Sequence, residues 1–237
     1  MYMKTLAFIL FIFFNPFVLA DSLKSAIESE IRSDKNILRD IHRNPYETLT
    51  FFGIRPDMKV IELSPGGGWY TEILAPYLKE EGELIAAHFD PSMGDFAKRV
   101  RGNFEKKLAS SSVYDRVKLV SLNTQYSEAK SVDAVVTFRN LHNWIGPNWN
   151  FIITSAHKSL KKGGVLGVVE HRAKQGTSLE NMKKTGYVTE EYAIESIEKL
   201  GFKLVAKSEI NSNPKDTKDH PKGVWTLPPV LRLKELD

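Results

Sequence analysis

The stretch that decides the fold is Val60-Ile61-Glu62-Leu63-Ser64-Pro65-Gly66-Gly67-Gly68-Trp69-Tyr70-Thr71, in a chain of 237 residues. A short apolar run predicts a buried strand, the glycines predict a turn, and a helix is expected from Thr71 onward. Three consecutive glycines let the backbone approach a ligand closely, because they carry no Cβ atoms. The N-terminus of the helix offers free N–H groups to a negatively charged group. We therefore expect a ligand at this turn.

Outward from this stretch, short apolar runs alternate with helical stretches, which is typical of a parallel sheet. We expect strands at residues 60–63, 84–89, 117–122, 134–138, 165–170 and 202–210, and helices at 71–80, 93–108, 149–160 and 189–200. Residues 223–227 have the composition of a seventh strand. A hairpin of the last two strands would place an antiparallel edge on a mostly parallel sheet.

Two common nucleotide sites do not fit the glycine turn. A dinucleotide site needs a third glycine at the sixth position of the fingerprint, where this chain has Thr71. A phosphate loop of nucleotide triphosphatases needs Gly-Lys followed by Ser or Thr, and that is missing as well. A nicotinamide oxidoreductase is therefore disfavoured.

The acidic Glu62 followed by Pro-Gly-Gly-Gly instead resembles motif I of class I S-adenosylmethionine-dependent methyltransferases. Further stretches between Arg39 and Leu231 resemble those of a bacterial group of exported predicted methyltransferases. They are Arg39-Asp40, Arg43-Asn44-Pro45, residues 51–56, 67–72 and 138–144, Glu170-His171-Arg172 and residues 223–229. The resemblance implies a Rossmann-like α/β fold with seven strands in the order 3-2-1-4-5-7-6 and helices on both faces.

The same resemblance implies which residues bind the cofactor, S-adenosylmethionine. Motif I would hold its amino-acid part through Glu62, Ser64, Pro65, Gly66, Gly67, Gly68, Trp69 and Tyr70. In the family an acidic residue at the end of the second strand binds the ribose, but this position is occupied by His88. Asp90, two residues later, is therefore our candidate for the ribose contact. Asp90 could equally cap the next helix. Asn123 replaces the usual adenine-binding Asp, and Arg139 and Asn140 complete the predicted cofactor site.

Polar residues after the fourth and fifth expected strands are the candidates for chemistry, because ligands bind at the carboxyl edge of such sheets. We predict His142 as general base and His171 as the second catalytic candidate, and we assign Asn143, Trp144 and Arg172 to the substrate. A purely structural hydrogen-bonding role for His142 and a surface ion pair for Arg172 stay open. No short ligand spacing indicates a metal site.

Residues 1–20 resemble a signal peptide, with Lys4, an apolar run and Val18-Leu19-Ala20 before Asp21. An uncleaved membrane anchor is the alternative. We expect a helical segment at 21–58 and one methyltransferase-like domain at 59–237. The chain has no cysteine, so this exported protein would depend on its core rather than on disulfides.

The net charge of +4 comes from scattered basic doublets rather than from a stripe, so we expect no nucleic acid partner. No stable membrane association is expected after signal cleavage. The sequence predicts methyl transfer from S-adenosylmethionine to a small molecule outside the cytoplasm, in the periplasm or the medium. Because that cofactor is made in the cytosol, the alternative is an exported, non-catalytic binding module for a nucleoside-like or acidic ligand.

Overall fold

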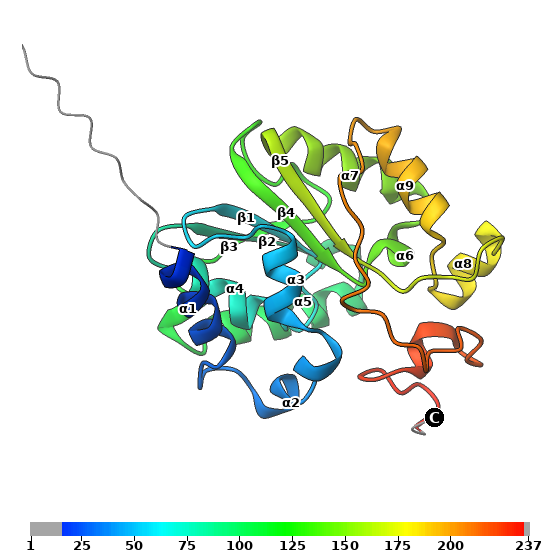
Figure 1. Cartoon of the computed structure of the whole chain (residues 1–237), viewed down its shortest axis with the longest axis horizontal. Helices are drawn as coiled ribbons and strands as arrows, with labels where there is room; N and C mark the ends of the chain where they lie inside the picture. Colours follow the sequence, from blue (N-terminus) through cyan, green and yellow to red (C-terminus); the bar gives the residue numbers. More distant parts are fainter. Residues whose placement is uncertain (1–15, 235–237) are drawn as a thin grey trace, which may run out of the picture.

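The centre of the structure is a sheet of parallel strands in the order β3-β2-β1-β4-β5 (Figure 1). The computed structural model describes residues 16–234. The strands are β1 (Lys59–Leu63), β2 (Glu83–His88), β3 (Lys118–Ser121), β4 (Val132–Phe138) and β5 (Leu160–Val169). The predicted Rossmann-like α/β fold and the order of the first five strands are confirmed.

Alternate residues of the central strands point into two separate cores, as the period of two in a strand requires. Val60 and Val136 pack with α1, α3 and α4 on one face of the sheet. Ile61 and Val135 pack with α6 and α7 on the other face. Both faces are therefore covered, and the strands read as continuous apolar runs in the sequence.

The helices that cover the sheet agree with the predicted ones to within a few residues at each end. The α-helices are α1 (Pro16–Ile27), α2 (Asp34–Ile37), α3 (Pro45–Phe51), α4 (Thr71–Leu78), α5 (Asp95–Leu108), α6 (Leu141–Trp144), α7 (Pro147–Ser159), α8 (Leu179–Thr185) and α9 (Glu190–Glu198). The 3-10 helices are η1 (Asp40–His42), η2 (Pro91–Met93), η3 (Ser112–Tyr114) and η4 (Gly223–Thr226). Among the α-helices, α6 and α8 were not predicted.

The predicted sixth and seventh strands are wrong. Residues 202–210 pair with no strand, and Val205 is 94% exposed. No other element among residues 16–234 covers the side chain of Val205, so the apolar composition of this segment does not lead to a strand. Residues 223–226 form η4, whose Val224 packs with Ala173 and Tyr187 in a small separate cluster. Local packing of this cluster replaces the predicted hairpin, and β5 is left at the edge of the sheet.

The N-terminal segment, residues 22–58, lies against the glycine turn. The buried carboxylate of Glu72 on α4 accepts a hydrogen bond from Asn36 Nδ2 at 2.9 Å and pairs with Lys107 of α5. Trp69 Nε1 donates to the carbonyl oxygen of Asn36 at 2.9 Å, and Tyr70 Oη donates to that of Arg43 at 3.3 Å. The first turn of α4 therefore fixes the position of this segment.

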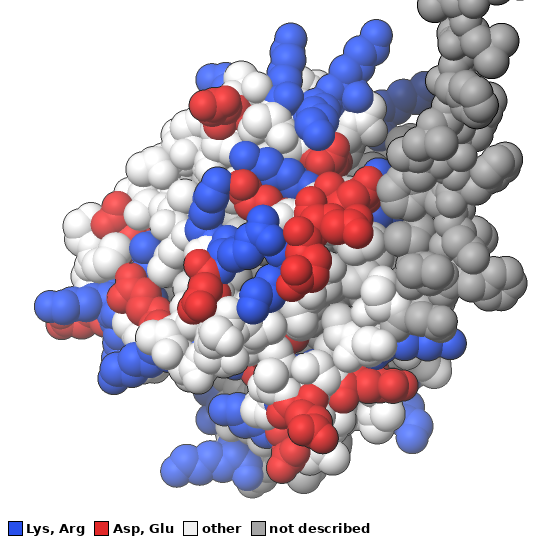
Figure 2. All heavy atoms as spheres, turned by 90° about the vertical axis from the view of Figure 1, so that its left-hand side faces the viewer, with Lys and Arg blue, Asp and Glu red and all other residues white. Residues whose placement is uncertain are grey.

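The predicted signal peptide can be followed only in part. Residues 1–15 lie outside the described residues, and α1 continues through the predicted cleavage position after Ala20. In the part of the chain that is described, no helix is long and apolar enough to cross a membrane. On the face drawn in Figure 2, basic and acidic side chains are interspersed. The division at residues 20 and 58 stays a prediction.

Candidate functional site

The glycine turn connects β1 to α4 and leaves a hollow beside its backbone. Ser64, Gly66 and Gly68 have φ values of 53°, 58° and 80°, a left-handed conformation that turns the chain sharply. A Cβ atom added at Gly66 or Gly67 would meet nothing within 4 Å, whereas one at Gly68 would lie 2.8 Å from Lys107 Cδ. The turn is thus open at Gly66 and Gly67 and packed against α5 at Gly68.

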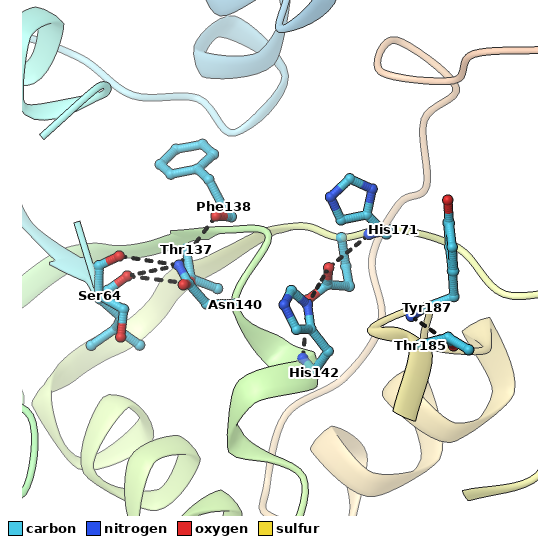
Figure 3. A network of polar contacts seen from close by, with 10 residues as sticks. Ser64, Thr137, Phe138, Asn140, His142, His171, Thr185 and Tyr187 are labelled. Atoms are coloured by element: carbon cyan, nitrogen blue, oxygen red, sulfur yellow. Dashed lines mark hydrogen bonds and ion pairs between the residues drawn. The ribbon is translucent and has the colours of Figure 1, made fainter. Parts of the chain in front are cut away.

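Side chains from two neighbouring strands hold this turn in place. The Asn140 amide donates to the carbonyl oxygens of Ser64 at 3.2 Å and of Phe138 at 3.1 Å (Figure 3). His88 Nδ1 accepts from the backbone N–H of Phe89 at 2.8 Å, so Nε2 carries the proton and donates to the Gly66 carbonyl at 3.1 Å. Asn140 and His88 therefore position the turn from opposite sides.

Glu62 places a carboxyl group at the base of the same turn. It lies on β1, is 2% exposed and accepts a hydrogen bond from Thr71 Oγ1 at 2.6 Å. Burial raises its pKa to about 7, although Thr71 and the charge of Arg43 act in the opposite direction. This carboxyl group can therefore change its protonation state near neutral pH when a cation arrives.

The ends of β4 and β5 bring His142 and Glu170 together. Glu170 Oε1 accepts from His142 Nδ1 at 3.1 Å, and Oε2 accepts from the backbone N–H of His142 at 3.2 Å. Burial would raise the pKa of Glu170, but the hydrogen bonds from His142 and from the backbone of His171 act against it, and the pKa is lowered. His142 Nδ1 thus carries the proton, which leaves Nε2 as the basic nitrogen.

His171 lies beside this pair but is held differently. Its backbone N–H donates to Glu170 Oε1 at 2.7 Å, and its ring packs edge-on to Tyr187 with the centroids 5.8 Å apart (Figure 3). Burial, opposed by Glu170, lowers the pKa of the ring to about 4. The imidazole is therefore neutral at pH 7.

One large cleft is lined by most of the predicted site residues. They include Glu62, Ser64, Pro65, Gly66, Gly67, Trp69, Tyr70, Arg139, Asn140, His142, Asn143, His171 and Arg172. Gly68, Asp90, Asn123 and Trp144 do not line it. The carboxyl ends of β1, β4 and β5 thus line one cleft, at the edge where ligands bind in open α/β sheets.

The predicted ribose and adenine residues lie together but outside this cleft. Asp90 caps η2 by accepting from the Ser92 N–H at 2.9 Å, as the capping alternative predicted. Hydrogen bonds from Ser92 lower its pKa, and Asn123 adds to the effect, so the two side chains are neighbours. The contacts of Asp90 with the ribose and of Asn123 with the adenine stay predictions.

Two predicted substrate residues have structural partners. Trp144 is 4% exposed and belongs to the core beneath α6 and α7. Arg172 forms ion pairs with Glu190 and Glu209, each at 2.7 Å, and these raise its pKa. Arg172 thus forms surface ion pairs, which was the alternative left open from the sequence. Because both carboxylates already occupy its guanidinium group, the side chain is not free to anchor an anion.

Some site residues were not assigned from the sequence. Glu170, Arg39 and Arg43 were identified only as parts of family stretches, yet all three line the cleft. The position of Glu170 directly after β5 is a signal that could have revealed it. No group of His, Asp and Glu that could hold a metal occurs among residues 16–234.

Comparison with known families identifies this site. The model described as "Methyltransferase domain" matches residues 61–168, which span β1 to β5 and include the glycine turn. These residues are similar to a methyltransferase domain. The predicted enzyme class, a methyltransferase, and its cofactor, S-adenosylmethionine, are thereby confirmed. No curated protein sequence gives a significant match.

Solved structures share the fold of the methyltransferase domain at low sequence identity. An S-adenosylmethionine-dependent methyltransferase from Aquifex aeolicus is 15% identical, with a TM-score of 0.57 over 79% of this chain and 90% of that chain. SpnF, described as a 4+2 cyclase, is also 15% identical, with a TM-score of 0.55 over 81% of this chain and 72% of its own. The likeness supports the architecture around the turn.

Substituting Gly67 tests whether the hollow beside the turn is a binding site. We expect Gly67→Val to fill it and to weaken the binding of S-adenosylhomocysteine at least about tenfold, a cost of about 1.4 kcal/mol. The unfolding temperature should stay unchanged, since a Cβ atom at Gly67 would meet nothing within 4 Å. Calorimetry and thermal unfolding measure the two effects.

The matched control is Gly68→Val, whose side chain would collide with Lys107 and Phe104. That variant should lower the unfolding temperature instead. Undiminished binding of S-adenosylhomocysteine by a folded Gly67→Val protein would show that the hollow is not used.

Proposed function

We propose that this protein transfers a methyl group from S-adenosylmethionine to an oxygen, nitrogen or carbon of a small-molecule acceptor outside the cytoplasm. One observation carries the proposal: the hollow of the glycine turn, with Glu62 at its base, opens into the cleft that also contains the His142–Glu170 pair. A site for the cofactor and a site for proton removal thus share one cavity.

The residues around the turn fit the amino-acid part of the cofactor. Glu62 offers a buried carboxylate to its ammonium group, and the open backbone at Gly66 and Gly67 leaves room beside it. Ser64 Oγ is buried without a hydrogen-bond partner in residues 16–234, so the turn holds an unused donor and acceptor. A ligand with both polar and charged groups would satisfy these atoms.

The bound cofactor supplies an electrophilic methyl group on a positively charged sulfur. The chain then has to align the acceptor and remove its proton where the attacking atom carries one. His142 Nε2 serves as that base, because Glu170 accepts a hydrogen bond from Nδ1–H and stabilises the imidazolium that forms. Asn140 positions the glycine turn relative to this base through its amide.

The proposed location rests on the sequence of the first twenty residues, since Lys4, an apolar run and a small-residue cleavage pattern precede Asp21. We expect expression of the full chain in a bacterium to yield an extracytoplasmic form that begins at Asp21. Mass measurement of the protein released from the periplasm tests this. A full-length mass confined to the cytosol would contradict the export proposal but leave the methyltransferase proposal intact.

The raised pKa of Glu62 predicts a pH-dependent cofactor affinity. Its carboxyl group is half protonated near pH 7 in the free protein and must ionise to pair with an ammonium group. Lowering the pH from 8 to 6 should therefore weaken S-adenosylhomocysteine binding about tenfold, and binding near pH 7 should release a proton. Calorimetry in buffers of different ionisation enthalpy measures both.

Glu62→Gln is the matched variant, because the amide keeps the shape of the side chain and cannot ionise. It should bind more weakly than the wild type at pH 8 and show neither the pH dependence nor the proton release. A wild-type affinity that is constant between pH 6 and 8 would remove Glu62 from the cofactor site.

His142 is tested by transfer of labelled methyl groups from S-adenosylmethionine into a bacterial small-molecule extract. If His142 is the base, His142→Ala should reduce the transfer rate by about 10²–10⁴-fold. Its affinity for S-adenosylhomocysteine should stay within about twofold of wild type, a free-energy change under about 0.5 kcal/mol. Glu170→Gln should slow transfer as well, because the imidazolium loses its partner.

His157→Ala is the control, since His157 lies near the end of α7 and packs against Phe202. Unchanged transfer by His142→Ala would exclude it as the base. A wild-type protein that prefers another ligand and transfers no label would support the binding-module alternative.

A further inference from the structure

Three arginines line the cleft next to the glycine turn. Arg39 and Arg43 come from the N-terminal segment on either side of η1, and Arg139 directly follows β4. Within residues 22–234, none of the three forms an ion pair with a carboxylate, although other arginines such as Arg32 and Arg101 do. Three positive charges thus gather at the cleft without an ion-paired carboxylate.

Arg139 is the most constrained of the three. Its backbone adopts the left-handed conformation with a φ of 61°, which is uncommon for a residue with a long side chain. Nη2 donates to the carbonyl oxygen of His42 over 3.4 Å, and Nη1 is buried without any partner among the described residues. A buried guanidinium N–H without an acceptor is costly, so a bound group that accepts from it would stabilise the site.

Arg43 shows the same lack of an ion-pair partner. Its guanidinium lies over the Trp69 ring, 4.7 Å from the centroid. Burial and the charges of Arg139 and Arg39 lower its pKa to about 9, so it remains charged at neutral pH. Burial and Arg139 also lower the pKa of Arg39. The three cations therefore repel one another, and an anion bound between them would be attracted by all three.

We propose that Arg39, Arg43 and Arg139 bind a carboxylate or phosphate group of the methyl acceptor. The acceptor would thus be an acidic small molecule, anchored by these arginines, with its reacting atom toward His142 in the same cleft. This inference rests on the proposed function, because it assigns the acceptor of that reaction. Planar guanidinium groups suit both kinds of anion through paired hydrogen bonds.

The charge balance favours the acceptor over the cofactor as the source of the anion. S-adenosylmethionine carries one carboxylate, and its ammonium and sulfonium groups leave it with a net positive charge. Glu62 is hydrogen-bonded to Thr71, and Glu170 is hydrogen-bonded to His142 and His171, so both carboxylates act on the arginines through their charge and form no ion pair with them. One cofactor carboxylate can accept hydrogen bonds from only part of the three guanidinium groups, which leaves donors for a second anion.

The test is calorimetric titration of the full chain, saturated with S-adenosylhomocysteine, with inorganic phosphate and separately with succinate. We expect at least one of these anions to bind while S-adenosylhomocysteine is present. Tighter binding of phosphate would indicate a phosphorylated acceptor, and tighter binding of succinate a carboxylic acid. Binding of neither anion would overturn the proposal.

Arg139→Gln should weaken anion binding at least about tenfold, because an orphaned buried donor is removed. It should not lower the unfolding temperature in the absence of anion, since the substitution also relieves repulsion within the cluster. Arg55→Gln is the matched control, because Arg55 is exposed and paired with Asp57 at 3.1 Å. That control should bind the anions as the wild type does.

Competition separates the acceptor from the cofactor. If S-adenosylhomocysteine excludes the anions and Arg139→Gln weakens both ligands, the arginines hold the cofactor carboxylate and the proposal is overturned. Arg39→Gln, at the exposed end of the cluster, replaces Arg139→Gln if that variant does not fold. Failure of the proposed function is recognised separately, as absence of S-adenosylhomocysteine binding by the wild type.

Discussion

Burying a carboxylate is costly unless hydrogen-bond donors surround it, and this constraint fixes how the parts of this protein meet. Glu62, Glu72 and Glu170 each carry a carboxyl group away from water. Thr71 satisfies the first, Asn36 and Lys107 the second, and His142 with the backbone of His171 the third. Thr71, Asn36, Lys107 and His142 each come from another element than the glutamate they bind, so the three glutamates join β1 to α4, α4 to the N-terminal segment and α5, and the end of β5 to α6.

The cleft is a consequence of these connections. Glu62 keeps the first turn of α4 beneath β1, so the glycine turn must bend outward and leave its hollow open. Glu170 keeps His142 at the neighbouring strand ends, where a base can face the same cavity. Glu72 holds the N-terminal segment over the turn through Asn36, and Arg39 and Arg43 reach the cleft from that segment. Positions distant in the sequence thereby form one site.

The first five strands were predictable because each contains a short apolar run, which is buried along most of its length in β1, β2 and β4. Their order followed from the family resemblance. The last two predicted strands have the right composition, but residues 202–210 lack a covering layer and residues 223–226 follow the packing of Val224. Composition shows whether a segment is suited to a β-strand, but the neighbouring strand with which it forms hydrogen bonds is determined by the tertiary structure. Periodicity alone could not supply that information.

The site divides in the same way. Glu62 and the glycine turn were predictable because a local motif contains all of them. The pairing of His142 with Glu170 spans 28 residues and needs the adjacency of β4 and β5. The capping role of Asp90 is local and was foreseen as an alternative, whereas the position of Arg43 at the cleft depends on the long-range docking of its segment.

Within residues 16–234, β5 has no strand on its outer side, and this affects how the protein behaves at high concentration. An unpaired strand at the margin of a sheet presents backbone donors and acceptors that can recruit another chain. In β5 this margin begins with Lys161 and Lys162, both exposed, and continues through Gly163, whose φ of 80° breaks the regular strand conformation. Lys161 is paired with Asp133, so the exposed charge of Lys162 and the irregular backbone at Gly163 are the features that oppose pairing of this edge with another chain.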